Sequence, residues 1–375
     1  MDSLLAHARA SQKSIIALIR ELVECESPSD NRDALDRFVS LMEDVVAPMA
    51  KVRILPHGHM RAEFRLPGAK QSGQILALGH SDTVWPMGTL RSMPFRQENG
   101  RLWGPGVLDM KSGLAFFVFA MRALRELDIP VAKKVVLQIN SDEEVGSGTS
   151  RALTEEAARK SDCVLVLEPG TGLAGKLKTA RKGVGAYRVS VRGKASHAGV
   201  DFEAGASAIV ELARQIERIE KFTDLKRGVT VNPGVISGGT RSNVVAAEAQ
   251  AEIDMRVARL KDSAGLDRKF QALRPFDKRC AIEVTGGMNR PPMERSRGIR
   301  ELFGRARGLA REIGVEVEES STGGGSDGNF TAAHTATLDG LGVDGKGAHT
   351  HYEQLYISSI EPRARLLHRL YQTLR

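Results

Sequence analysis

Apolar residues recur at helical spacing at the start of the chain and then give way to short apolar runs. The helical spacing predicts an amphipathic helix ending near Cys25 and a second helix over residues 30–46. Predicted strands follow at residues 52–55, 62–66, 75–78, 135–139 and 164–167, and predicted helices at 112–127 and 150–160. The last three strands are continuous apolar runs, as in strands covered on both faces. Strands that alternate with helices predict an α/β domain with a mostly parallel sheet flanked by helices.

The pattern changes near residue 179 and changes back near residue 291. Between these points we predict strands at 187–192, 229–236, 246–257 and 281–285, and helices at 205–220 and 261–273. Their order, β-α-β-β-α-β, is typical of a small α+β sandwich. The earlier pattern returns with helices at 298–313 and 358–374, a Gly-rich loop at 323–328 and a strand at 335–338. We therefore predict one α/β domain, residues 1–179 and 291–375, interrupted by a smaller domain at 180–290.

Composition supports this organisation and narrows the function. A chain of 375 residues is longer than a domain with a single hydrophobic core usually is, so two domains are expected. The net charge of +8 comes from scattered Lys and Arg, which fits a solvated basic surface or acidic small substrates. With only 5% aromatic residues the chain offers few platforms for stacking bases, so nucleic acid is not an expected partner.

The cysteines and the hydropathy of the chain indicate its cellular compartment. Three distant cysteines form neither a disulfide framework nor a metal-binding pair, which favours a reducing cytoplasm. The N-terminal segment has helical periodicity rather than the apolar core of a signal peptide. Since no apolar stretch approaches the length of a transmembrane span, no membrane partner is expected.

Acidic and histidine residues gather in five islands at the ends of predicted strands or in Gly-rich loops. The islands are His80-Ser81-Asp82, Asp109, Glu143-Glu144, Glu168 and His349. The carboxyl ends of parallel strands meet at one edge of a sheet, where α/β proteins bind ligands. Two imidazoles and several carboxylates suit two divalent metal ions bridged by one carboxylate. The islands together therefore indicate metal-assisted hydrolysis.

Each island taken alone also allows a plainer interpretation. His80 and Asp82 alternate along extended chain, so only His80 would face an ion and Asp82 would fix its tautomer, although an H-x-D pair can also be structural. Asp109 ends a rigid Gly/Pro turn and could cap the following helix instead of bridging two metals. The acidic run 142–144 could be a solvated turn. With a metal present, one of its carboxylates would bind and a neighbour would act as general base.

Six motifs, in this order and spacing, carry a resemblance to a known family. They are G-H-S-D-T-V at 79–84, G-P-G-V-L-D-M-K-S-G at 104–113, N-S-D-E-E-V-G-S at 140–147, L-E-P-G at 167–170, G-G-G-S-D-G-N at 323–329 and G-A-H-T-H-Y-E at 347–353. Over nearly its whole length the chain resembles the M20 family of metallopeptidases and amidohydrolases, in particular its bacterial glutamate carboxypeptidases.

The resemblance implies a site with two Zn²⁺ ions, for which Co²⁺ or Mn²⁺ could substitute. It implies that Asp109 bridges the ions, that His80 and Glu168 complete one metal site, and that Glu144 and His349 complete the other. It further implies that Glu143 is the general base, that Asp82 orients His80, and that the Asp109–Met110 peptide is cis. The family spacing of a histidine and a glutamate four residues later selects His349, with His351 as the near alternative.

The resemblance also implies the reaction and the partners. The inserted domain would be a lid and would hold a homodimer together, with His197 reaching the substrate or its oxyanion across the dimer. Implied substrate contacts are Asn243, Arg256, Arg290, Gly324 and Ser326. The arginines would grip a carboxylate bidentately, and the amides of the Gly-rich loop could also hold one.

The implied substrate is a small molecule or short peptide with a free carboxylate. We expect hydrolysis of the amide bond between an acyl group and a C-terminal amino acid, with glutamate as the first candidate. Carboxypeptidases and deacylases of the family resemble this chain in having a glutamate at the position of Glu168, whereas its aminopeptidases commonly have an aspartate there. The resemblance therefore disfavours an aminopeptidase. The alternatives are an N-acyl-amino-acid deacylase of the acetylornithine or succinyl-diaminopimelate type and a dipeptidase.

Overall fold

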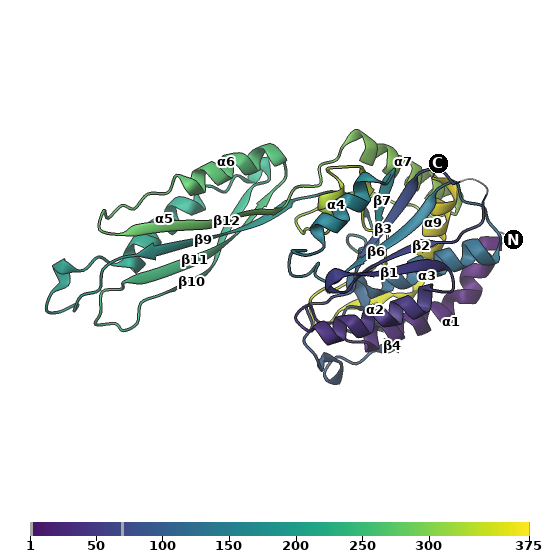
Figure 1. The fold of residues 1–375 in the computed structure, drawn as a ribbon, viewed down its shortest axis with the longest axis horizontal. Coiled ribbons are helices and arrows are strands. Elements are labelled where there is room, and N and C mark those ends of the chain that lie inside the picture. Colours follow the sequence, from purple (N-terminus) through teal and green to yellow (C-terminus); the bar gives the residue numbers. More distant parts are fainter. Residues whose placement is uncertain (1–2, 69–70, 375) are drawn as a thin grey trace. The chain divides into compact units, whose positions relative to one another are not determined.

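The computed structural model describes residues 3–68 and 71–374 and divides the chain into two compact units (Figure 1). The larger unit comprises Met1–Ala180, Arg295–Thr322 and Ser326–Arg375. The smaller unit comprises Arg181–Glu294 and Gly323–Gly325. The main segment of the smaller unit begins one residue after, and ends four residues after, the predicted range of 180–290. The smaller unit is thus inserted in the larger one.

A six-stranded sheet forms the centre of the larger unit, in the order β1-β2-β6-β3-β7-β14. The strands are β1 (Ala50–Leu55), β2 (His59–Phe64), β3 (Gln74–His80), β6 (Lys134–Asn140), β7 (Cys163–Val166) and β14 (Ala336–Leu338). β3 pairs in parallel with β6 and β7, and β14 pairs in parallel with β7. β2 pairs antiparallel with β1 on one side and with β6 on the other, so among the described strands of this sheet β2 alone runs opposite to the rest, next to the β1 edge. The mostly parallel sheet that the apolar runs predicted is therefore confirmed.

Helices cover both faces of this sheet. They are α1 (Ser3–Glu24), α2 (Arg32–Val46), α3 (Ser112–Glu126), α4 (Arg151–Arg159), α7 (Arg297–Glu312), α8 (Gly328–Thr331) and α9 (Ile360–Thr373). In β3, Ile75 and Ala77 join the large core with α1, α3 and α9, whereas Leu76 and Leu78 join a second core under α4. Burial on both faces explains why residues 75–78 of this strand are all apolar.

Short elements that the sequence did not predict complete the larger unit. A small sheet has the order β15-β16-β5-β4, and a two-stranded sheet pairs β13 with β8. Their bounds are β4 (Arg96–Glu98), β5 (Arg101–Trp103), β8 (Leu177–Arg181), β13 (Glu319–Thr322), β15 (Gly345–Lys346) and β16 (Gln354–Tyr356). Single helical turns lie at Pro56–Gly58, Thr89–Arg91, Val107–Lys111 and Ile357–Ser359 in the larger unit, and at Phe202–Ala204 and Leu225–Arg227 in the smaller one. Strands of two to five residues are too short to show a period.

The smaller unit is an antiparallel sheet with the order β10-β11-β9-β12, covered by two helices (Figure 1). Its elements are β9 (Gly183–Arg192), α5 (Ala208–Glu220), β10 (Thr230–Gly238), β11 (Glu248–Val257), α6 (Leu260–Gln271) and β12 (Ala281–Arg290). Every second residue of β11 is buried, as a sheet with one covered face requires. In the core Tyr187 stacks on Phe270, with ring centroids 3.8 Å apart.

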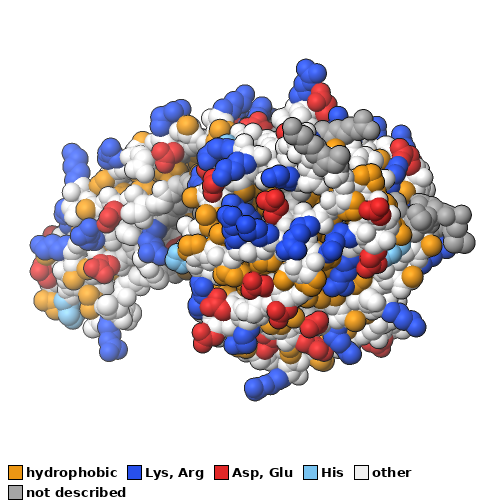
Figure 2. Space-filling model, turned by 45° about the vertical axis from the view of Figure 1, so that its right-hand side comes forward, with side chains coloured by type: hydrophobic (Ala, Val, Ile, Leu, Met, Phe, Trp, Pro, Cys, Tyr) orange, Lys and Arg blue, Asp and Glu red, His pale blue; other side chains and the backbone are white. Residues whose placement is uncertain are grey.

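Two surface properties follow from the described residues. None of the helices in residues 3–68 and 71–374 combines the length and apolar character needed to cross a membrane. Figure 2 shows basic side chains spread over the visible face with acidic ones between them. On this face the basic side chains are therefore dispersed rather than gathered in one patch.

Candidate active site

The carboxyl edge of the parallel strands brings the first two predicted ligands together. His80 is the last residue of β3, and Glu168 follows β7, which pairs directly with β3. The Nε2 atom of His80 lies 3.5 Å from Oε1 of Glu168 and 3.3 Å from Oδ1 of Asp109. His80 is buried, so these oxygens and its own nitrogen form an enclosed cluster.

Asp109 lies between two such clusters. Its second oxygen, Oδ2, is 3.4 Å from Nε2 of His349. The same nitrogen lies 3.2 Å from Oε1 of Glu144. Each imidazole thus faces Asp109 and one further carboxylate, which is the symmetry that a bridging carboxylate requires. The Asp109–Met110 peptide is cis, as the resemblance implied.

His351, the alternative to His349, lies elsewhere in the same loop. Its ring packs on Trp85, with centroids 5.4 Å apart, whereas His349 adopts a left-handed backbone conformation with φ of 61° and faces Asp109. The geometry favours His349 as the ligand.

Asp82 makes two sets of contacts, and the sequence indicated only the one with His80. The Nδ1 atom of His80 lies 2.9 Å from the main-chain oxygen of Asp82 and 3.4 Å from its Oδ1. Donation from Nδ1–H to that carbonyl would leave Nε2 with a lone pair for a metal. The carboxylate of Asp82 itself accepts the backbone N–H groups of Glu143 and Glu144, at 3.1 and 3.0 Å, and the hydroxyl of Ser29 at 2.8 Å. It therefore also holds the loop that carries the predicted base.

The carboxylates of the cluster favour positive charge at its two imidazoles. Burial lowers the pKa of His80, but hydrogen bonds to Asp109, Asp82 and Glu168 raise it well above its usual value. Hydrogen bonds to Asp109 and Glu144 raise the pKa of His349 to about 11. Burial would raise the pKa of Asp109, yet the two imidazoles lower it below its usual range. The carboxylates thus stabilise positive charge at both nitrogens, where metal ions would bind in place of protons.

The donor set fits two divalent ions. Ligand atoms of His80, Asp109 and Glu144 all lie within 4.8 Å of one another. Imidazole nitrogens and carboxylate oxygens are ligands that zinc accepts. Glu143 is half-buried, and its charge contributes to the raised pKa of His80, which places its carboxylate near the same cluster.

Glu353 is a residue to which the sequence assigned no role. It is fully buried, and its Oε1 accepts the N–H groups of Leu108 and Asp109 at 2.8 and 3.1 Å. Its Oε2 accepts the N–H of Gly106 at 3.0 Å and the indole N–H of Trp85 at 2.9 Å. Burial raises the pKa of Glu353 to about 7 despite these bonds. The glutamate of the His-x-x-x-Glu spacing was the available signal, but the sequence could not show what it binds.

In the smaller unit, His197 and Asn243 lie on adjacent segments. The carbonyl of Asn243 accepts the N–H of Ala198 at 3.0 Å. His197 is exposed, and its Nδ1 accepts the N–H groups of Gly199 and Val200, both at 3.2 Å. The ring is therefore held by its Nδ1 side.

The predicted arginines and the Gly-rich loop are engaged in other contacts. The Nε atom of Arg256 donates to both carboxylate oxygens of Asp254, at 2.9 and 3.1 Å, so a bidentate grip on a substrate would require that pair to open. Arg290 is buried. The carbonyl of Gly324 accepts Nη1 of Arg181 at 3.2 Å.

Ser326, the last predicted substrate contact, belongs to the larger unit. Its hydroxyl is buried and donates to Oδ2 of Asp339 at 2.8 Å. This hydroxyl therefore supports the interior of the unit.

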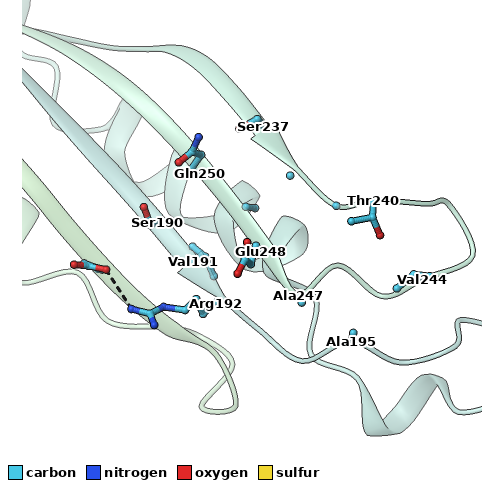
Figure 3. Close-up of a pocket in the computed structure, with 14 residues that line it drawn as sticks. Ser190, Val191, Arg192, Ala195, Ser237, Thr240, Val244, Ala247, Glu248 and Gln250 are labelled. Carbon is cyan, nitrogen blue, oxygen red and sulfur yellow. Dashed lines mark hydrogen bonds and ion pairs between the residues drawn. The ribbon is translucent and has the colours of Figure 1, made fainter.

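A hollow of about 750 Å³ lies on the open face of the smaller unit's sheet (Figure 3). Ser190, Arg192 and Gln250 line it, and an ion pair joins Arg192 to Glu283 at 3.3 Å. None of the predicted site residues is among the described residues that line this hollow. It is distinct from the metal-ligand cluster, which lies in the larger unit.

Two histidines and three carboxylates that face one another at the carboxyl edge of a mostly parallel sheet are a donor set that fits a metal-dependent hydrolase. The model of peptidase family M20/M25/M40 matches residues 76–373, and the chain belongs to this family. It is therefore a hydrolase of amide or peptide bonds.

Individual relatives agree with this assignment. The chain is 32% identical over 304 residues to carboxypeptidase G2 of Pseudomonas sp. (strain RS-16), covering 79% of this chain and 72% of that protein. It is 28% identical over 303 residues to acetylornithine deacetylase of Klebsiella pneumoniae (strain 342), covering 74% and 77%. Among solved structures, aminopeptidase PepT of Bacillus cereus ATCC 10987 superposes with a TM-score of 0.78 at 23% identity, covering 96% and 98%. This last likeness concerns the fold.

Proposed function

We propose that the protein is a di-zinc carboxypeptidase that releases a C-terminal amino acid, glutamate first, from an acyl or peptidyl group. The observation that carries the proposal is Asp109, which lies between His80 with Glu168 on one side and His349 with Glu144 on the other. These five residues would hold the two ions, with Asp109 as the bridge. Ions held there would polarise the scissile carbonyl and lower the pKa of a bound water toward ~7.

The residues of the chain itself perform the proton transfers. Glu143 takes a proton from the attacking water and later delivers it to the leaving amine. Asp82 keeps Glu143 in place by accepting its backbone N–H, and keeps the His80 ring in one orientation through its carbonyl. Glu353 fixes the backbone of Asp109. The proton path therefore depends on loops that buried carboxylates hold.

The smaller domain, predicted at 180–290, is proposed to act as a lid and as the contact of a homodimer. His197 would stabilise the oxyanion. Asn243, Arg290 and the backbone amide of Gly324 would contact the substrate. Arg256 would do so once its ion pair with Asp254 opens. A cytoplasmic location remains our prediction, which rests on three unpaired cysteines.

The preference for a C-terminal glutamate rests on the resemblance to bacterial glutamate carboxypeptidases and on the basic charge balance of the chain, whereas Glu168 only favours carboxypeptidases and deacylases over aminopeptidases. Similarity to acetylornithine deacetylase supports a second candidate, an N-acyl-amino-acid deacylase with the same chemistry and a different acyl pocket. The two candidates differ in the substrate that they require, so substrate tests separate them.

The test uses purified protein loaded with zinc and a panel of N-acyl-glutamates, N-acetylornithine and an unblocked dipeptide. Release of glutamate that a chelator abolishes supports the carboxypeptidase proposal. Turnover restricted to short N-acyl amino acids would replace it by the deacylase. Cleavage of the unblocked dipeptide alone would contradict our interpretation of Glu168.

A further inference from the structure

The loop that carries Glu143 and Glu144 is a tight turn between β6 and α4. We call residues 140–147 the base loop. The N–H of Ser147 donates to the carbonyl of Asp142 at 2.7 Å, and the N–H of Gly146 donates to that of Glu143 at 3.0 Å. Ser147 has a φ of 59°, in the left-handed region that non-glycine residues rarely adopt. The loop therefore needs contacts from outside to keep this shape.

Asp327, from the start of α8, joins the two ends of the base loop. Its Oδ2 accepts the side-chain amide of Asn140 at 2.6 Å, and its Oδ1 accepts the hydroxyl of Ser147 at 2.5 Å. Asp327 is 3% exposed, and both partners are fully buried. Hydrogen bonds to an ionised carboxylate are shorter and stronger than those between neutral groups. One side chain thus bonds to the first and the last residue of the loop.

Other contacts hold the loop between these ends. The carboxylate of Asp82 accepts the N–H groups of Glu143 and Glu144. Nδ1 of the buried His59 lies 3.1 Å from the N–H of Ser141. With its ends and its centre bonded, the backbone at residues 143–144 has little freedom, and the two carboxylates start from one fixed position.

We propose that Asp327 is a positioning residue for catalysis, because it clamps Asn140 and Ser147 and so sets where the carboxylates of Glu143 and Glu144 lie. The proposal rests on the proposed roles of Glu143 as base and Glu144 as ligand. A displacement of about 1 Å in a reacting group can lower a rate about 100-fold. Loss of the clamp therefore acts on turnover without removing any group that touches the substrate.

The experiment compares three variants with one matched control. Asp327→Ala removes the hydrogen bonds to Asn140 and to Ser147. Ser147→Ala removes only the second of these bonds, and it replaces Asp327→Ala in the experiment if that variant does not fold. Asp327→Asn keeps an oxygen that accepts from Asn140 and offers an amide N–H to the hydroxyl of Ser147. It therefore tests whether a side chain of the same shape restores the two contacts. The control is Thr337→Val, because Thr337 is equally buried and its hydroxyl bonds to Thr331, outside the base loop.

The first readout is hydrogen exchange in the metal-free protein, which does not depend on the proposed activity. In Asp327→Ala we expect peptides covering the base loop to exchange about tenfold faster, while Thr337→Val leaves them unchanged. Asp327→Asn should restore most of the protection. Unchanged exchange in Asp327→Ala, or equally faster exchange in the control, would overturn the clamp.

The second readout is turnover of the zinc-loaded protein. We expect kcat of Asp327→Ala to fall 10- to 100-fold with KM within about threefold, and kcat of Thr337→Val to stay at the wild-type value. Faster exchange combined with unchanged kcat would overturn the positioning role. If wild type and variants all lack hydrolase activity, the proposed function fails and the exchange result alone decides the clamp.

Discussion

Replacing Glu353 by glutamine tests how the Asp109 turn is held. The wild-type carboxylate accepts four hydrogen bonds, two at each oxygen. In Glu353→Gln one oxygen becomes an NH₂ group, which faces two donors whichever way the amide is turned. Two buried donors then lose their acceptor, at about 1–3 kcal/mol each. The free energy of unfolding should therefore fall by about 2–6 kcal/mol with no change in side-chain volume.

The assay is urea unfolding of metal-free protein, followed by zinc competition with a chromophoric chelator. Because Asp109 donates its N–H to Glu353, the variant should also bind zinc about 10- to 100-fold more weakly. The control is Glu361→Gln, at an ion pair of 2.9 Å with Arg365 on α9. It should cost less than about 1 kcal/mol and leave zinc binding unchanged. Equal stability and zinc affinity in both variants would refute the reasoning.

Three further predictions concern single side chains. Glu143→Ala should keep its metal content and lose turnover by about 100- to 10,000-fold, so normal activity with full zinc would contradict its role as base. His349→Ala should lose one metal equivalent in elemental analysis and His351→Ala none, and the reverse result would exchange their assignments. Burial raises the pKa of Cys163 to about 12, so it should resist iodoacetamide at pH 8 while half-buried Cys25 reacts first, as mass spectrometry can check.

The central sheet could be predicted because its strands are buried on both faces. Runs 75–78, 135–139 and 164–167 became β3, β6 and β7, and the return of the pattern after residue 291 correctly placed α7, β14 and α9. The strands at Arg96–Glu98 and Gln354–Tyr356 were missed, because three residues carry no measurable alternation. The element order of residues 180–290 predicted a small α+β sandwich, and the structure shows that β9, β10, β11 and β12 form one antiparallel sheet.

The part of the candidate site that lies at the ends of the parallel strands could be predicted from the sequence. His80 and Glu168 end neighbouring parallel strands, so their proximity follows from the strand pattern. The engagement of Arg256 with Asp254 and of Ser326 with Asp339 did not follow, since each depends on a side-chain rotamer. Sequence motifs mark which residues belong together, but they do not show which partner each polar atom has.

The buried carboxylates of this site fall into two groups with different chemistry. Asp109, Glu144 and Glu168 face imidazole nitrogens. By contrast, Asp82 and Glu353 accept backbone N–H groups of the turns that carry Glu143, Glu144 and Asp109, and Asp327 accepts the side chains of Asn140 and Ser147.

A carboxylate suits this second role because it accepts at both oxygens and brings no donor that would itself need a partner. Around Asp82 and Glu353, turns at the carboxyl edge of the sheet place several backbone donors close together, and an amide side chain there could satisfy only half of them. The same turns present Asp109, Glu143 and Glu144. Substitutions that remove the hydrogen bonds of Asp82, Asp327 or Glu353 should therefore disturb metal affinity and turnover even though none of the three is a proposed ligand.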